Sequence, residues 1–92
     1  GVIETYIKKF NEIDIAMLAN GASKCGKELA TAVMSLMQES GVIETHIKTF
    51  NAIDIAMLAN GASKCGEELA TSVMSLMQVC VKIYTSKISL IL

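Results

Sequence analysis

The sequence contains no proline, no tryptophan and no arginine, and its only aromatic residues are two tyrosines and two phenylalanines among 92 residues. Without proline, helices can run without the breaks that its missing N–H group imposes. Without arginine, the chain lacks the planar guanidinium that binds phosphate or carboxylate through two parallel hydrogen bonds. Because the formal net charge is also only -1, we expect no nucleic-acid partner, since nucleic-acid-binding domains carry an excess of positive charge.

Long apolar runs are missing as well. The longest, 15–19, is far shorter than the roughly 20 residues that a membrane-spanning helix needs, so we expect no transmembrane segment. Yet 52% of the residues are apolar and only 18% are charged, which is too hydrophobic for a disordered chain. A chain of this length has little interior in which to bury so many apolar side chains. The composition therefore predicts an apolar partner, which in our leading interpretation is a second copy of the chain.

The most prominent feature that the sequence does contain is an internal duplication. Residues 41–80 match residues 1–40 at 33 positions, including Asn11 and Lys24, which we expect to face solvent. We divide the chain into repeat unit 1 (1–40), repeat unit 2 (41–80) and a C-terminal tail (81–92), which together form one domain. The seven differences between the units are Tyr6/His46, Lys9/Thr49, Glu12/Ala52, Lys27/Glu67, Ala32/Ser72, Glu39/Val79 and Ser40/Cys80.

Each unit has the apolar periodicity of two helices. Apolar residues recur at spacings of three and four, as on one face of an amphipathic helix. The first unit predicts a helix over about 3–19, a stop at Asn20 and Gly21, and a second helix over about 24–38 that Ser23 caps. We therefore expect an all-α fold, a tandem duplicated helical hairpin whose four helices pack as a bundle, with a short apolar tail.

Two segments leave alternatives open. The segment 13–19, IDIAMLA, is apolar nearly all round, and a short apolar run also fits a buried strand, which would give β-α repeat units in place of hairpins. The tail 81–92 is rich in β-branched residues. It is compatible with an extension of the last helix, with an edge strand, or with a segment that packs across the bundle.

The segment 13–19 and its copy are also the predicted interface. A helix without a polar face is either deeply buried or in contact with another molecule. Asp14 and Asp54 interrupt these runs, and we expect each to pair with a lysine or a backbone donor at an interface rather than to serve acid–base chemistry. The candidate interface residues are Ile13, Asp14, Ile15, Met17, Leu18, Ile53, Asp54, Ile55, Met57 and Leu58.

One short segment resembles a phosphate-binding loop. Residues 21–27, GASKCGK, match the G-x-x-x-x-G-K part of the loop found in P-loop nucleotide-binding proteins, which implies phosphate binding by backbone N–H groups and Lys27. The hydroxyl residue that would hold magnesium is replaced by Glu28, and the second copy has Glu67 in place of the lysine. We keep a degenerate phosphate-binding loop as a remote alternative and favour a glycine-containing turn. We expect no catalytic residues and no cofactor.

The cysteines and the single histidine form no recognisable metal-binding pattern. Cys25, Cys65 and Cys80 contain no C-x-x-C pair, and His46 stands alone, so we expect no metal site. We favour buried thiols for Cys25 and Cys65 and keep a disulfide or a reactive thiol as alternatives. Because the chain begins at Gly1 without an initiator methionine, we interpret it as a processed chain or a piece of a longer one, and we assign no compartment.

The six methionines allow two interpretations. Methionine is flexible and polarisable, so it fills irregular cores and also lines apolar grooves. The first interpretation supports our leading hypothesis, a non-enzymatic module for helical self-association or protein interaction. The second supports an alternative, a small helical carrier of an apolar ligand.

Overall fold

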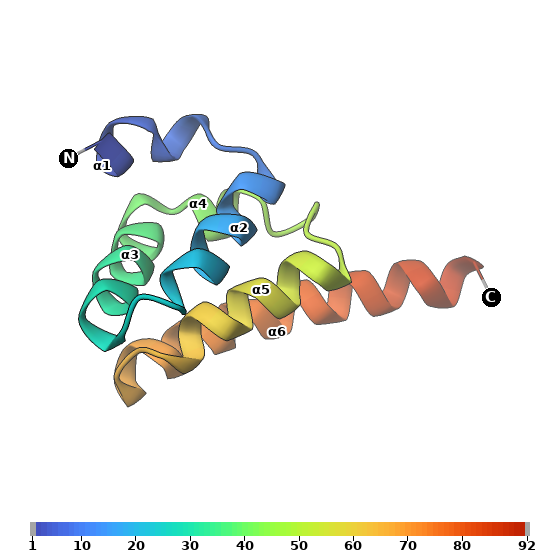
Figure 1. Cartoon of the computed structure of the whole chain (residues 1–92). Coiled ribbons are helices and arrows are strands. Elements are labelled where there is room, and N and C mark those ends of the chain that lie inside the picture. Colours follow the sequence, from blue (N-terminus) through green and yellow to red (C-terminus); the bar gives the residue numbers. More distant parts are fainter. Residues whose placement is uncertain (1, 92) are drawn as a thin grey trace.

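The computed structural model describes residues 2–91, except for the side chains of Cys80, Tyr84 and 86–91. Helices account for all the regular structure in this part of the chain, and no strand occurs in it, so the predicted all-α class is confirmed and the β-α alternative is wrong. In chain order (Figure 1), the elements are α1 (Val2–Tyr6), the 3-10 helix η1 (Ile7–Lys9), α2 (Glu12–Ala22), α3 (Lys27–Ser40), α4 (Val42–Thr45), α5 (Ala52–Ser63) and α6 (Glu67–Ile91).

The helix predicted over 3–19 is divided at Phe10 and Asn11. Asn11 has extended backbone, and its side-chain oxygen accepts a hydrogen bond from the N–H group of Asp14 at 2.8 Å. In return, the N–H group of Asn11 donates to the carboxylate of Asp14 at 3.1 Å. This reciprocal capping box begins a new helix at residue 12, so the prediction of one continuous helix is wrong. The same arrangement joins Asn51 and Asp54 at the start of α5.

Helix α2 also ends later than predicted. Helix α2 continues through Gly21 to Ala22, and the hydroxyl of Ser23 donates to the carbonyl of Asn20 at 2.6 Å instead of capping α3. The turn is made at Gly26, whose φ of 93° lies in the region that glycine adopts without steric cost. The predicted stop at residues 20 and 21 and the predicted serine cap are therefore both wrong.

The last helices of the two units end differently because a glycine follows unit 1 and a valine follows unit 2. Helix α3 ends at Gly41, the first residue of unit 2, whose φ of 75° is the left-handed conformation typical of helix C-termini. Val81 takes the corresponding place after unit 2, and there the helix continues. Helix α6 therefore includes the backbone of 81–91, one of the three alternatives for the tail, and its last part extends away from the other helices (Figure 1).

The core lies where the two units meet. Helix α2 packs most closely against α5, while α3 packs against both α5 and α6. Three of the six methionines, Met34, Met37 and Met77, are buried in this core, where their flexible side chains can fill irregular space. The largest fully buried side chains are those of Ile7, Ile15, Met34, Met37, Ile43, Leu58, Val73 and Met77.

Candidate functional site

The predicted interface residues are distributed between the core and the surface. Ile13, Met17 and Ile53 expose 52%, 59% and 66% of their surface, so they are available to another molecule. Ile15 and Leu58 are fully buried within the chain itself. The residues of intermediate exposure are Leu18, Ile55 and Met57.

The two interrupting carboxylates have a local role. Asp14 and Asp54 each accept a hydrogen bond from the backbone N–H group of the asparagine that caps their helix. Asp14 is exposed, whereas Asp54 exposes only 4% of its surface. Helix capping therefore explains why a carboxylate interrupts each apolar run, in line with the expected backbone donor.

A concave apolar surface lies on unit 1, between α1, the end of α2 and the first half of α3. It consists of two adjoining hollows of about 410 Å³ and 390 Å³, which share Ile3, Leu29 and Val33. Leu29, which lines both hollows, is 57% exposed. We call this surface the unit 1 groove, and its lining consists of Val2, Ile3, Glu4, Met17, Leu18, Gly21, Ala22, Cys25, Leu29, Ala32, Val33 and Leu36.

Gly21 keeps the groove open at one end. A Cβ atom built there would meet no heavy atom of the described chain within 4 Å, apart from its own helical surroundings. The exposed thiol of Cys25 lies one turn further on and donates to the carbonyl of Gly21 at 3.4 Å. The groove therefore combines an apolar lining with one accessible thiol.

The equivalent glycine of unit 2 is covered by unit 1. A Cβ atom at Gly61 would lie 2.8 Å from Sδ of Met34 and 3.0 Å from the carbonyl oxygen of Ala19. Cys65 is half-buried, and its thiol donates to the carbonyl of Gly61 at 3.5 Å. Burial raises the pKa of Cys65, and the Thr31 hydroxyl, which can donate to a thiolate, opposes this by a smaller amount.

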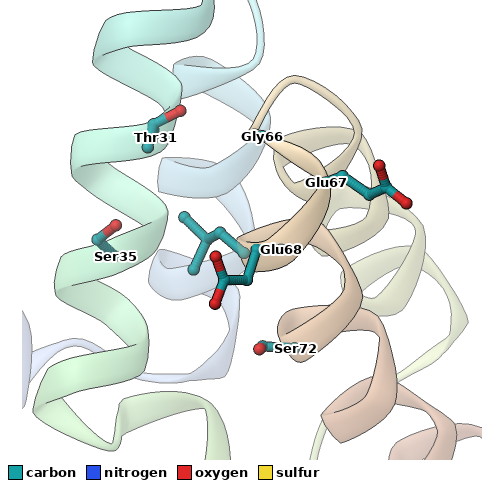
Figure 2. Close-up of a pocket in the computed structure, with 7 residues that line it drawn as sticks. Thr31, Ser35, Gly66, Glu67, Glu68 and Ser72 are labelled. Atoms are coloured by element: carbon teal, nitrogen blue, oxygen red, sulfur yellow. The ribbon is translucent and has the colours of Figure 1, made fainter.

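A second, more polar hollow of about 460 Å³ lies between α3 and the start of α6. Figure 2 shows Thr31 and Ser35 on one side and Glu68 and Ser72 on the other, with the carboxylate of Glu68 directed into the space between the helices and that of Glu67 directed away. The hydroxyl of Thr31 is buried and has no hydrogen-bond partner among the described residues while Cys65 keeps its proton. We interpret this hollow as a place where the contact between the two units is incompletely packed.

The segment that resembles a phosphate-binding loop has another local structure. Gly21 and Ala22 belong to α2, so a helix precedes the turn, where P-loop proteins have a strand. No strand exists in the described chain to supply that context. The Ser23 hydroxyl bonds within its own turn, and Lys27 begins α3. The segment therefore serves as the connection between two helices.

The described thiols and the histidine do not form a metal-binding cluster. Cys25 and Cys65 are both free thiols in the structure; Cys25 is exposed, so the expectation that it is buried is wrong, and Cys65 is half-buried. The side chain of Cys80 lies outside the described residues. His46 places Nδ1 3.9 Å from Oε2 of Glu12 and tilts its ring over Phe50, with ring centroids 6.3 Å apart. Within the described chain, no three His, Cys, Asp or Glu side chains gather closely enough to hold a metal ion.

Two further observations bear on the class of protein. None of the helices in the described chain combines the length and the apolar character needed to cross a membrane. Comparison with protein-family models, with curated proteins and with solved structures found no match. Together, the fold and the site define a small all-α protein with an apolar groove on one of two nearly identical sequence units.

Sequence reasoning missed most of this groove. The spacing of apolar residues in 24–38 places Leu29, Val33 and Leu36 on one apolar face of a helix. That spacing does not tell whether the face is buried or open to solvent. The nearest signal was Gly21, since a glycine inside an apolar helix often marks a close approach by another group. The sequence has this glycine in both units, and only the structure shows which one is approached.

Proposed function

We propose that the protein is a non-enzymatic self-association module, built as a tandem pair of helical hairpins in a bundle-like arrangement, whose binding surface is the unit 1 groove. The observation that carries this proposal is the cluster of large exposed apolar side chains, Val2, Met17 and Leu29, around one concave surface. Contiguous apolar surface on a small protein marks interaction sites. Apolar side chains in a concave site also supply the fully desolvated centre that a stable interface needs.

The chemistry of the groove supports binding rather than catalysis. Among the described residues that line it, Glu4 is the one charged side chain and Cys25 is the one nucleophile. A catalytic thiol needs a neighbouring base within hydrogen-bond reach, whereas the Cys25 thiol donates to a backbone carbonyl. The groove can therefore bind an apolar surface, but its lining offers no pair of groups for proton transfer.

Sedimentation velocity over a wide concentration range tests this proposal. We expect the weight-average mass of the wild-type chain to rise above 9.8 kDa with concentration, and the Leu29→Lys variant to remain nearer the monomer. Ile53→Lys is the matched control, because Ile53 is 66% exposed but lies on α5 and does not line the groove. A wild-type chain that stays monomeric at several hundred micromolar would refute the proposal.

The volume of the groove supports a second candidate function, the carriage of a small apolar molecule. Its hollow of about 390 Å³ lies within the range of about 300–1,000 Å³ that is usual for ligand sites. An environment-sensitive apolar dye should then bind the wild-type chain at one site per monomer, with displacement by a fatty acid and loss of binding in Leu29→Lys. Dye binding that is unchanged in Leu29→Lys would exclude the groove as a carrier site.

A further inference from the structure

The two units bury non-equivalent faces against each other. Unit 1 contributes a face that carries Ala19 and Met34, both fully buried. Unit 2 contributes the face around Gly61, where a Cβ atom would lie 2.8 Å from Sδ of Met34 and 3.1 Å from Cβ of Ala19. The methionine side chain therefore occupies the space above the glycine, and the absence of a Cβ atom allows this close approach.

The same contact continues along α3 and α6. Thr31 and Ser35 of unit 1 line one hollow together with Leu69 and Ser72 of unit 2 (Figure 2). We call the first set the methionine face of unit 1, defined by Ala19, Thr31, Met34 and Ser35. We call the second set the groove of unit 2, defined by Gly61, Leu69 and Ser72.

Unit 1 retains an open counterpart of the groove that unit 2 uses. The equivalent residues are Gly21, Leu29 and Ala32, which are all exposed and all line the unit 1 groove. Two of these three positions carry the same residue in both units, and the third replaces serine by alanine, which makes the open groove more apolar than the covered one.

Unit 2 retains an open counterpart of the methionine face. Met74 is 43% exposed where Met34 is 0% exposed, and Thr71 and Ser75 are exposed as well. Together with Ala59 they form the methionine face of unit 2, whose four residues are identical to those of unit 1. The chain therefore displays, at two different places, both halves of an interface that it already makes internally.

We propose that the chain associates head to tail, with the methionine face of unit 2 of one molecule in the unit 1 groove of the next and Met74 seated above Gly21. This inference rests on the proposed self-association and specifies its partner surface. The contact is heterologous, so it produces an open chain of molecules or a closed ring, in contrast to a two-fold dimer that pairs one surface with itself. The contact of Met34 with Gly61 within each molecule shows the packing that the new contact repeats.

Two single variants and their mixture test the direction of assembly. Met74→Lys damages the methionine face and leaves the groove intact, while Leu29→Lys does the reverse; both residues are exposed, so we expect both variants to fold, as checked by circular dichroism. Each variant alone should have a dissociation constant about tenfold or more above that of the wild type, because a charge is placed at the centre of an apolar contact. An equimolar mixture should form a one-to-one complex, since each variant supplies the surface that the other lacks.

Ile53→Lys is the matched control, because Ile53 is 66% exposed on α5 and belongs to neither face. We expect it to associate like the wild type. If the wild type associates but Met74→Lys associates equally well, or if the mixture of variants stays monomeric, the head-to-tail inference is wrong while self-association stands. If the wild type is monomeric throughout, the proposed function itself fails, and the inference with it.

The thiol of Cys25 gives an independent readout of where the contact forms. Cys25 lines the unit 1 groove and is exposed, so its alkylation should slow several-fold as the concentration is raised into the association range. The same increase should leave the alkylation rate unchanged in Met74→Lys. A Cys25 rate that is independent of concentration in an associating wild-type sample would place the contact elsewhere and overturn the inference.

Discussion

Units 1 and 2 have nearly the same sequence but present different surfaces. Met34 is fully buried and Met74 is 43% exposed; Asp54 is 4% exposed and Asp14 is on the surface. Each pair has the same residue in a local sequence that differs at one nearby position, Glu12/Ala52 or Ala32/Ser72, and both members of each pair lie in helices, so local propensity does not explain the difference. The environment of each residue is set by the unit that packs against it, and the packing is asymmetric because each unit offers a different face.

The few positions at which the units differ take part in this asymmetry. Glu12 is alanine in unit 2 and His46 is tyrosine in unit 1, and these two residues contact each other between the units at 3.9 Å. Within unit 1, the Lys9 ammonium lies 5.6 Å from the ring centroid of Tyr6, and both residues are replaced in unit 2. Substitution after duplication has thus given the two units different partners.

Truncation of the equivalent methionines should produce the largest difference between the units. We expect Met34→Ala to lower the free energy of unfolding by about 2–5 kcal/mol, because it leaves a cavity in the core. Met74→Ala should cost less than about 1 kcal/mol, because its side chain is partly exposed in the monomer. Urea denaturation at a concentration at which the chain is monomeric measures both. Equal losses would contradict the asymmetric packing.

The equivalent glycines should respond with opposite signs. A methyl group at Gly61 would meet the backbone oxygen of Ala19 at 3.0 Å as well as Met34, so Gly61→Ala should destabilise the fold by about 1–3 kcal/mol. Gly21→Ala meets open space inside a helix and should stabilise the monomer by up to about 1 kcal/mol, since alanine has the higher helix propensity. Thermal denaturation of the two variants decides this. If Gly61→Ala is as stable as Gly21→Ala, α5 and α2 are not in close contact at this point.

The sequence could predict the helical class but not the distribution of burial. Apolar spacing of three and four residues, and the absence of proline, lead to an all-α fold that the structure confirms. Two further features were readable in principle: the Asn11 and Asp14 capping box, and Val81 at the position where Gly41 ends α3. The sequence could not predict that Gly61 lies in a contact while Gly21 lines an open groove. The two residues are identical, and their environments differ only through neighbours that lie far away along the chain.

The equivalent cysteines should differ in reactivity. In a Cys80→Ser background below the association range, iodoacetamide should alkylate Cys25 several-fold faster than Cys65, because Cys25 is exposed while burial limits access to Cys65 and raises its pKa above the ordinary value of 9.0. Peptide mass spectrometry after a timed quench resolves the two sites. Equal rates would show that unit 1 does not shield Cys65.

The raised pKa of Cys65 also has a consequence for stability. The unfolded thiol loses its proton at a lower pH than the folded one, so the contribution of Cys65 to the unfolding free energy is constant well below pH 9.0 and falls as the pH rises through that value. The wild type should therefore lose stability relative to Cys65→Ser as the pH is raised through 9.0, as measured by urea denaturation. A difference that is independent of pH would contradict the desolvation of this thiol.

The contact between Glu12 and His46 should produce the smallest effect and tests whether the substitutions stabilise the pairing of the units. The two side chains are 34% and 22% exposed, so solvent screens their attraction and a coupling free energy of at most about 1 kcal/mol is expected. A double-mutant cycle with Glu12→Gln and His46→Gln isolates this term. Because an electrostatic attraction between exposed groups is screened by salt, the coupling should fall as the ionic strength is raised. A coupling that salt leaves unchanged would instead assign the contribution of His46 to its packing on Phe50, which does not need the charge.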